Sequence, residues 1–392
     1  MTVAPHPTSA SPAYDLDSLH QEFQTATRAF VRRHLLPRVD EAEALGTLPA
    51  DLWPLLGQQG LLGIGYPEEL GGSGEADTLA VALLCEELAK TSGGITASIT
   101  ASAYMAAPHL AKYGTPEQQR RYLEPLIAGR AVASIAVSEP GAGSDVAAMR
   151  TVARQVEGGY QLSGTKLFIT NGGVADTLIV AAKTDTAAGH RGITTFIVEK
   201  GDPGFTVGKA LHKMGWRSSD TRELIFDDCF VPSERVLGEP GRGFYAVMNA
   251  FQTERVVLAG MGVGLAQAAL DDAVAHAKLR ETFGQPIGRH QAIRHKLAGM
   301  AVRTQTARLF TYAAAAKLDA GSPDALDFVA MAKYEAARAA NDVADDAVQI
   351  FGGYGYTDEY RVSLHYRDAR ILRIGGGSDE IMLEVIAKRL GL

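Results

Sequence analysis

The chain has 392 residues, of which 46% are hydrophobic and 21% are charged, so it is a globular protein long enough for two or three domains and too apolar to be disordered. Its formal net charge is −7 and its basic residues do not cluster, which argues against nucleic acid or an anionic membrane surface as the main partner. The two cysteines, Cys85 and Cys229, supply neither a disulfide framework nor a metal-ligand set, so we expect no metal and a cytoplasmic location.

The first part of the chain predicts a tail followed by helices. Residues 1–15 have no periodic apolar pattern and lack the cationic and apolar regions of a signal peptide, so we interpret them as a disordered tail. From residue 16 to residue 130 apolar residues recur at helical spacing, which predicts an N-terminal α-helical domain. Thr115, Pro116 and Gln118 have the spacing of a capping box in which the proline opens the helix. We find no apolar run of the roughly 20 residues that cross a bilayer.

The pattern changes between residues 131 and 237. Short runs of Val, Ile, Thr and Phe, such as TLIVAAKTD and GITTFIVEK, are separated there by Gly, Asn, Asp and Pro, which predicts β-strands. Glu157-Gly158-Gly159 predicts a hairpin turn. Because no helices alternate with these strands as a parallel sheet would require, we expect a small antiparallel β-barrel.

Residues 238–392 return to long helical patterns. Their breaks fall at Gly284-Gln285-Pro286, at Gly321-Ser322-Pro323 and around Gly352-Gly353, which predicts a C-terminal four-helix bundle. The expected fold is therefore mainly α with a central β domain. This order excludes a dinucleotide-binding fold, in which strands and helices alternate.

The longest apolar helix is expected between Gly241 and Gly284 and carries Glu254 and Arg255 near its middle. Burying a carboxylate is unfavourable unless it is paired or functional, and the loss of water raises its pKa towards that of a useful base. From this helix alone two interpretations stay open. Glu254 is either a catalytic base or a structural partner in a buried ion pair, with Arg255 or with another helix.

Three further segments could bind a cofactor. The loop from Ser138 to Ser144, SEPGAGS, offers free backbone amides, and the strand end Phe168-Ile169-Thr170 places a ring and a hydroxyl on one face, which suits a flavin or a nucleobase. Arg280 and the run from Gln349 to Gly353 combine a guanidinium with glycine-rich backbone, which suits a pyrophosphate. Taken singly, each would also suit an ordinary loop or strand end.

Together and in this order, these segments resemble the acyl-CoA dehydrogenase family from about Leu16 to Leu392. AVSEPGAGSDVAA is similar to the first signature of that family, and QIFGGYGYTDEY followed by HYRDARILRI is similar to most of the second. The resemblance implies a helical domain, a barrel and a four-helix bundle, assembled as a homotetramer with FAD between subunits. It also implies FAD-dependent α,β-dehydrogenation of an acyl thioester, with an electron-transfer flavoprotein as the acceptor.

The resemblance further implies roles for individual residues. Ser138, Phe168 and Thr170 are expected at the flavin ring, and Ser144 at the cofactor or the thioester tail. The residues expected to reach the FAD of a neighbouring subunit are Arg280, Phe283, Gln291, Gln349, Gly352 and Gly353. The residues expected to return to the subunit's own FAD are Ser378 and Glu380, and those expected at the substrate, besides Ser144, are Arg255, Gly376 and Gly377.

A departure from the family pattern bears on Glu254. Most members carry the catalytic carboxylate in a Tyr-Glu-Gly-Thr run, where this chain reads Gly375-Gly376-Gly377-Ser378. A branch that includes isovaleryl-CoA and long-chain acyl-CoA dehydrogenases carries its Glu on the long helix before an Arg, which Glu254 and Arg255 resemble. We therefore expect Glu254 to remove the α-proton while the β-hydride passes to flavin N5, and the Gly376 amide to stabilise the thioester oxygen.

Two alternatives to this function remain at this point. The same chemistry could act on an acyl or aminoacyl group tethered to a carrier protein, or the chain could be a non-catalytic flavoprotein of the same fold, an option that Gly376 raises. Leu364, followed by His365, stands where the family usually has a Lys or Arg in the stretch before RDA. We interpret His365 as a histidine of the surface or of a helix face.

Overall fold

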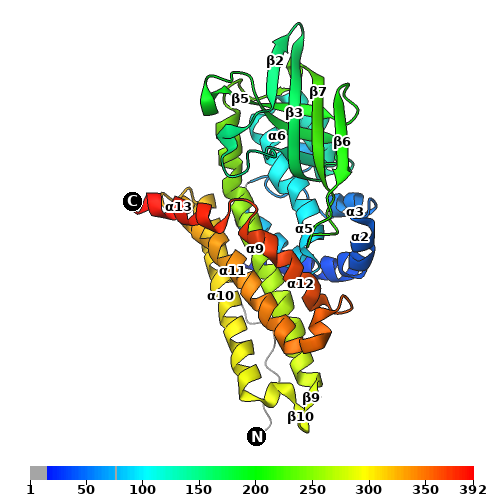
Figure 1. The fold of residues 1–392 in the computed structure, drawn as a ribbon, viewed down its shortest axis with the longest axis vertical. Helices are drawn as coiled ribbons and strands as arrows, with labels where there is room; N and C mark the ends of the chain where they lie inside the picture. The colour runs from blue at the N-terminus through cyan, green and yellow to red at the C-terminus, as the bar shows by residue number, and fades with distance from the viewer. Residues whose placement is uncertain (1–15, 76) are drawn as a thin grey trace.

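The computed structural model describes residues 16–75 and 77–392, and the expected tail at residues 1–15 lies outside the described residues. Helices from both ends of the chain pack side by side, and a β-sheet lies at one end of the long helices (Figure 1). The helices of the N-terminal part are α1 (Ser18–Phe30), α2 (Val39–Leu45), α3 (Leu52–Gln58), α4 (Thr78–Ala89), α5 (Gly93–Thr100), α6 (Ala107–Tyr113), α7 (Pro116–Gln118) and α8 (Glu124–Ile127). Helical turns of π geometry extend α1, α5 and α7 at Val31–Leu35, Ala101–Ala106 and Gln119–Leu123.

The predicted capping box is present at the start of α7 and also connects this helix to the sheet. The Thr115 hydroxyl accepts from the Gln118 amide at 3.2 Å, and the Gln118 side chain accepts from the Thr115 amide at 3.0 Å. The side-chain NH₂ of Gln118 donates to the carbonyls of Glu234 and Val236 at the edge of the sheet. One glutamine therefore both starts a helix and covers backbone acceptors of an edge strand.

The central sheet is open and mixed, so the prediction of a closed antiparallel barrel was wrong. Its strands are β1 (Ala133–Ala136), β2 (Val152–Val156), β3 (Gly159–Thr170), β4 (Thr177–Lys183), β5 (Ile193–Glu199), β6 (Phe205–Ala210), β7 (Thr221–Pro232) and β8 (Val236–Leu237). The order is β6-β7-β3-β2-β4-β5-β8, with β1 parallel to β4 and β2 joined in parallel to β4 at one residue pair. The hairpin predicted at Gly158 joins β2 to β3.

The physical reason for the open sheet is that its two edges do not pair with each other in the described chain. A barrel requires β6 and β8 to form a ladder, but β8 has two residues and packs on the N-terminal helices, where Leu237 joins Leu110 and Ile127 in one apolar cluster. The two halves of the sheet still enclose a shared core, in which the ring centroids of Tyr160 and Phe196 lie 5.1 Å apart. Strand periodicity alone cannot distinguish such a folded sheet from a barrel.

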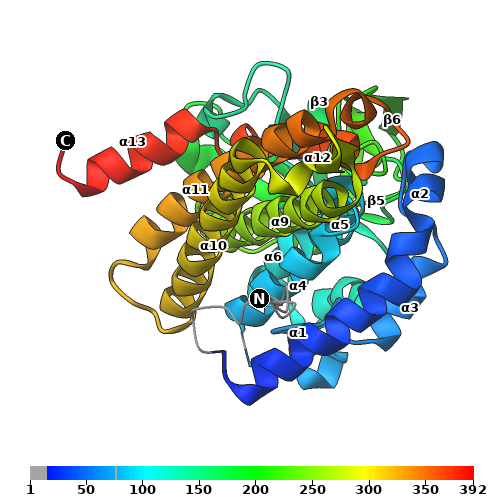
Figure 2. The same cartoon turned by 90° about the horizontal axis from the view of Figure 1, so that it is seen from below.

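The C-terminal part consists of α9 (Gly243–Leu279), the short β9 (Glu281–Thr282) and β10 (Gln285–Pro286), α10 (Gln291–Asp319), α11 (Ala325–Phe351), α12 (Arg361–Ala369) and α13 (Asp379–Arg389). Seen from below, α9 lies between α10 and α11 on one side and the N-terminal helices α4 to α6 on the other (Figure 2). The shorter α12 packs against α9 and α11 and completes the bundle. The predicted breaks between the long helices are all observed.

Glycines on α9 allow its neighbours to approach closely. A Cβ on Gly260 would lie 2.7 Å from the Ala82 carbonyl oxygen of α4, and a Cβ on Gly264 would collide with the Glu86 carbonyl of the same helix. By length and composition α9 is long and apolar enough to cross a membrane, contrary to the expectation that no apolar run of that length exists. Since 83% of its most apolar stretch is buried within the protein, this apolar character reflects a central core helix.

Asp368 joins the three parts of the chain. Its carboxylate accepts from the amide of Gly93 at the start of α5 at 2.8 Å and from the amide of Trp216, after β6, at 2.6 Å. The side chain belongs to α12 and is fully buried. Backbone amides from the helical domain and from the sheet domain are thus satisfied by one carboxylate of the bundle.

His365 is on a helix face, as predicted, but not on the surface. It is fully buried on α12, with Nε2 3.7 Å from the Asp272 carboxylate of α9, and burial lowers its pKa. Cys85 and Cys229 are both buried and unpaired, and burial raises the pKa of each thiol. Both thiols are therefore expected to be unreactive.

We predict that Asp368→Asn lowers the stability of the protein. The new NH₂ group cannot accept from a backbone N–H, so one buried amide loses its partner at a cost of about 1–3 kcal/mol. Thermal unfolding followed by circular dichroism should show a melting temperature several degrees lower. Asp358→Asn is the matched control, because the Asp358 side chain is 72% exposed and pairs with Arg217 and Arg367 rather than with buried backbone amides. Equal melting temperatures for both variants would contradict a joining role for Asp368.

Candidate functional site

Glu254 and the Gly375–Gly377 segment meet, although they are 121 residues apart in the chain. Glu254 lies in the half of α9 that is nearer the sheet, and the loop before α13 crosses this helix (Figure 1). A Cβ built on Gly376 would lie 3.4 Å from Oε1 of Glu254. The same Cβ would collide with Cδ1 of Leu258, one turn further along α9. A carboxylate from the helix thus reaches the position where Gly376 has no side chain.

The Glu254 carboxylate has no partner within the part of the chain that the structure describes. No hydrogen bond or ion pair joins it to Arg255, the structural partner considered from the sequence; the guanidinium of Arg255 is instead within 3.5 Å of the Gly376 carbonyl and 3.3 Å of the Gln252 side chain. Burial raises the pKa of Glu254 to about 7, against smaller lowering effects of Arg255 and Lys333. A desolvated, unpaired carboxylate with this pKa is suited to accept a proton near neutral pH.

Cations from three elements hold the glycine loop. Arg255 of α9 reaches the Gly376 carbonyl, and the ammonium of Lys333 on α11 donates to the Gly377 carbonyl. Arg373 donates to Asp379 at 2.7 Å and so connects the two ends of the loop. The amides of Gly376 and Gly377, by contrast, donate to no residue of the described chain. The loop therefore presents unused N–H donors beside Glu254.

A buried ion pair positions the loop that carries Ser138. Lys166 of β3 is fully buried and donates to Glu139 at 2.8 Å and to the Val137 carbonyl at 3.0 Å. Glu139 also accepts from the amides of Arg150 and Thr151. The Ser138 carbonyl accepts from the amide of Leu167 at 2.9 Å. This network places Ser138 next to the strand segment that leads to Phe168.

Phe168 is presented to solvent by a strained bulge in β3. The pairing of β3 with β7 shifts between Lys166 and Ile169, and Phe168 has a φ of 63°, which is unfavourable for a residue with a side chain. The ring is 66% exposed, an unusual position for phenylalanine. Thr170 follows, held by a hydrogen bond of 2.6 Å from the Ser134 hydroxyl to its carbonyl. Strain and exposure together are typical of a binding position.

The Ser138 loop and Glu254 lie on the same side of the molecule. Val137, Ala142 and Val146 of the loop pack against Val247 of α9, and Phe251, one turn before Glu254, packs on the same cluster. Ser144, from the same loop, is exposed. The predicted flavin residues of the sheet and the predicted base are thus brought to neighbouring surfaces of one protomer.

A second group of predicted residues lies at the opposite end of α9. Arg280 is its C-terminal cap, 26 residues after Glu254, and the helical rise places the two residues about 40 Å apart. The guanidinium carbon of Arg280 lies 5.6 Å from the ring centroid of Tyr354. Arg280 has no ion-pair partner in the described chain. The exposed members of this group are Arg280, Phe283, Gln291, Gln349, Gly352 and Gly353. No single small molecule can contact both groups within one protomer.

Ser378 and Glu380 lie beside the glycine loop. Ser378 caps α13, where its hydroxyl accepts from the Ile381 amide at 3.4 Å. Glu380 is exposed in the first turn, and backbone N–H donation together with Ser378 lowers its pKa. Both residues are therefore on the Glu254 side of the molecule.

The available groups fit FAD. The exposed ring of Phe168 and the hydroxyls of Ser138 and Thr170, which make no hydrogen bond in the described structure, suit the ring system. At the far end of α9, a guanidinium lies near Gly352 and Gly353, where a Cβ would meet nothing within 4 Å. Open backbone beside an unpaired guanidinium suits a diphosphate. No cluster of His, Cys, Asp or Glu in residues 16–75 and 77–392 could hold a metal ion.

Sequence reasoning missed Lys333 and Leu258. Lys333 is 1% exposed among Val329, Ala332 and Ala336 on the buried face of α11. A lysine at the apolar helical spacing of small residues was the available signal, since such a position costs free energy unless the charge has a task. Leu258 gave no signal, because its relation to Gly376 is tertiary.

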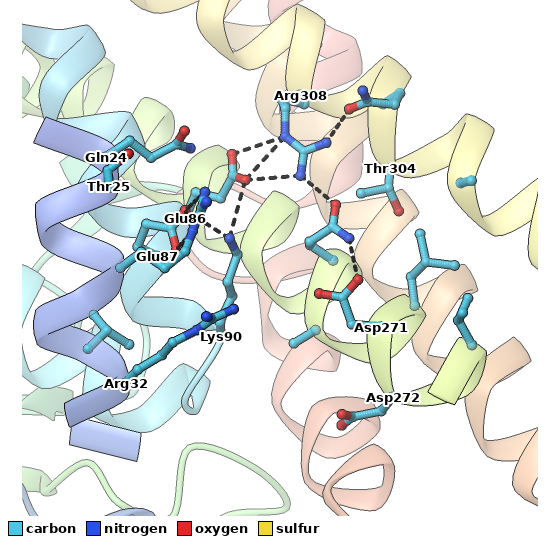
Figure 3. Close-up of a pocket in the computed structure, with 18 of the residues that line it drawn as sticks. Gln24, Thr25, Arg32, Glu86, Glu87, Lys90, Asp271, Asp272, Thr304 and Arg308 are labelled. Carbon is cyan, nitrogen blue, oxygen red and sulfur yellow. Dashed lines mark hydrogen bonds and ion pairs between the residues drawn. The ribbon is translucent and has the colours of Figure 1, made fainter. Parts of the chain in front are cut away.

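A cavity of about 850 Å³ lies elsewhere, between α1, α4, α9 and α10 (Figure 3). Its charged groups are largely paired with one another: Glu86 with Arg308 at 2.9 Å and with the Tyr312 hydroxyl at 2.7 Å, and Glu87 with Arg28 at 2.8 Å. None of the predicted site residues lines it. The contacts of Glu86 join α4 to α10 of the bundle, and the Glu87–Arg28 pair joins α4 to α1, so neither set forms the candidate active site.

Known proteins of one family match this chain over nearly its whole length. Three family models match, described as the N-terminal, middle and C-terminal domains of acyl-CoA dehydrogenase, over residues 17–130, 134–229 and 241–391. The mitochondrial isovaleryl-CoA dehydrogenase of Oryza sativa subsp. japonica is 42% identical over 376 residues, which cover 95% of this chain and 91% of that protein.

Solved structures agree in fold. A chain of the structure named "Electron transferring flavoprotein of Acidaminococcus fermentans: Towards a mechanism of flavin-based electron bifurcation" matches with a TM-score of 0.93 at 39% identity, covering 96% of this chain and 99% of that chain. The FAD complex of PigA matches with a TM-score of 0.91 at 32% identity, covering 97% and 99%.

The fold, the side chains suited to a flavin ring and these similarities lead to one conclusion. The chain belongs to the acyl-CoA dehydrogenase family and is an FAD-dependent oxidoreductase that dehydrogenates acyl-CoA.

Proposed function

We propose that Glu254 is the base that removes the α-proton of the acyl thioester and that the Gly376 amide stabilises the thioester oxygen. The observation that carries this proposal is the unpaired, desolvated carboxylate of Glu254, 3.4 Å from the position of a Cβ on Gly376. In most of the family a carboxylate of the loop would occupy this place. Here the helix supplies the carboxylate and the loop supplies backbone only.

The chemistry explains why both groups are needed. An α-hydrogen of a thioester is a weak acid, so its removal requires a desolvated base near its optimal pKa and a donor for the charge that develops on the oxygen. Glu254 meets the first requirement and the unused amide of Gly376 meets the second. Bound FAD supplies the acceptor for the β-hydride. Sheet residues such as Phe168 and Thr170 would hold its ring against the face of the acyl chain opposite Glu254.

We propose CoA, rather than a carrier protein, as the carrier of the acyl group, and an electron-transfer flavoprotein as the acceptor. The acyl-CoA names of the relatives support the first choice. The matching structure from Acidaminococcus fermentans, named for an electron transferring flavoprotein, supports the second. A cytoplasmic location remains part of the proposal. Free acyl-CoAs that leave the flavin oxidised, while the same acyl groups on a carrier protein reduce it, would reverse the choice of CoA.

The base assignment is tested by Glu254→Gln, which keeps the volume but removes the basicity. Anaerobic stopped-flow reduction of the flavin by an acyl-CoA that reduces the wild type should fall by at least about 10²–10⁴-fold, while binding still perturbs the flavin spectrum. Because a pKa of about 7 means that Glu254 is ionised only above that pH, kcat/KM of the wild type should rise with pH and level off above about pH 7.

The matched control for this variant is Asp271→Asn. Asp271 lies on the same helix, and burial also raises its pKa, but it contacts Gln267 and lines the separate polar cavity. Reduction by the control should remain at the wild-type rate. If Glu254→Gln reduced the flavin as fast as the control, Glu254 would be a structural residue only.

We also propose that two protomers complete each FAD site and that the protein is a homotetramer. This proposal is supported by the separation of about 40 Å between Glu254 and Arg280, which leaves Arg280, Phe283, Gln291, Gln349, Gly352 and Gly353 without a ligand in their own protomer. Exposed donors of this kind on a helix end suit the diphosphate of a neighbour's FAD.

We therefore expect Arg280→Ala to lose FAD and assembly together. The variant should show a lower flavin absorbance per protein and a smaller mass by light scattering, and added FAD should partly restore both, since a ligand stabilises the state that binds it. Arg120→Ala is the control, because Arg120 is exposed and pairs only with Glu117. A wild-type monomer with full FAD occupancy would rule out the shared site.

A further inference from the structure

Three consecutive glycines form the loop that must hold the oxygen-binding amide in place. Gly376 and Gly377 have φ values of 64° and 99°, which favour glycine. Glycine also loses more conformational freedom on folding than any other residue, so a run of three is poorly ordered by itself. The amides of Ile374 and Gly375 both donate to the Ile371 carbonyl, but these two hydrogen bonds order only the beginning of the run. The rest of the loop needs external contacts.

Lys333 provides the most deeply buried of these contacts. Its side chain is 1% exposed on α11, and its ammonium donates to the Gly377 carbonyl, the one acceptor that it meets in the described chain. An ammonium has three N–H donors. In the described chain only one of them is used, in the hydrogen bond to the loop. A buried charge that is only partly satisfied is usually less stable than an apolar side chain of similar size. Stability alone does not account for a lysine at this position.

We propose that Lys333 is a positioning residue for the reaction: through the Gly377 carbonyl it fixes the glycine loop over Glu254, so that the Gly376 amide meets the thioester oxygen when Glu254 meets the α-carbon. This inference rests on the function proposed above. Arg255 assists from α9 with a longer contact to the neighbouring carbonyl. The carbonyls of Gly376 and Gly377 are thereby directed towards α9 and α11, and the amides of the same two residues have no acceptor in the described protein.

The charge of Lys333 also acts on the base. Glu254 is influenced by Arg255 on its own helix and by Lys333 across from α11, and both lower its pKa against the effect of burial. Lys333 in turn faces Asp379 and Glu380 of α13 in addition to Arg255 and Glu254. Removal of the ammonium should therefore raise the pKa of Glu254, so the protonated, inactive form persists to higher pH. This effect separates a role in the reaction from a role in packing.

The test compares Lys333→Met with Lys333→Arg in the FAD-loaded enzyme. Methionine fills the volume without a donor or a charge, and a misplacement of about 1 Å at a reacting centre can cost up to roughly 10²-fold. We expect kcat for flavin reduction to fall by roughly 10- to 100-fold with KM nearly unchanged. The rise of kcat/KM with pH should move to higher pH, and the melting temperature and FAD content should stay at the wild-type values or rise.

Lys333→Arg keeps the charge and a donor, so it should recover part of the lost rate and the wild-type pH profile. Lys317→Met is the charge-matched control: Lys317 lies on α10, pairs with Asp324 in the turn before α11 and is remote from the loop. Its reduction rate and pH profile should equal those of the wild type.

Each outcome decides the question. A Lys333→Met enzyme with wild-type kcat and pH profile would overturn the positioning role, and so would a loss of rate explained by a matching loss of FAD or of folded protein. If the wild type itself were not reduced by any acyl-CoA, the proposed function would fail and this inference with it. If an acyl-CoA reduced the flavin of the wild type and of Lys333→Met at the same rate, the inference about Lys333 would fail and the proposed function would stand.

Discussion

The site depends on a carboxylate that is desolvated but has no partner in the described chain. Among the residues that the structure describes, Glu254 has no counterion within hydrogen-bonding distance although Arg255 is its neighbour in the chain, because the Arg255 guanidinium is directed to the Gly376 carbonyl. This arrangement costs stability, and it leaves a carboxylate whose pKa of about 7 suits the proton transfer proposed for it. Leu258 closes the space beside it and would collide with any side chain at Gly376. In this structure the helix therefore supplies a carboxylate where the loop has no side chain.

The remainder of the fold positions this pair. Glycines of α9 let α4 approach closely, and the Glu86–Arg308 pair joins the N-terminal helices to α10. Asp368 links helix α5, the segment after β6 and the bundle. The sheet in turn brings Ser138 and Phe168 towards the same half of α9 through the Glu139–Lys166 pair. Apart from the glycine contacts, each of these interactions joins a buried polar side chain to a group from another part of the chain, so they set the arrangement of the domains.

Helical and strand periodicity predicted most elements, because amphipathic patterns and turn residues are local signals. The breaks at Gly284, Gly321 and Gly352 and the capping box at Thr115 were predicted correctly for this reason. The closed barrel was wrong, since whether β6 and β8 meet depends on the helices that cover β8. For Glu254, the helix gave only two equal interpretations, and resemblance to a family branch favoured the base. The helical spacing of Lys333 among small residues was a local signal of its burial, but its contact with the Gly377 carbonyl is tertiary and could not be predicted from the sequence.

The central claim is that Glu254, and no other group, accepts the α-proton. The most direct measurement is exchange of that proton with solvent: an acyl-CoA analogue that cannot give up a β-hydride is incubated with the enzyme in deuterium oxide and then analysed by mass spectrometry. The account predicts that the wild type incorporates deuterium at the α-carbon and that Glu254→Gln, with the analogue bound equally well, does not. Equal incorporation by both enzymes would contradict it.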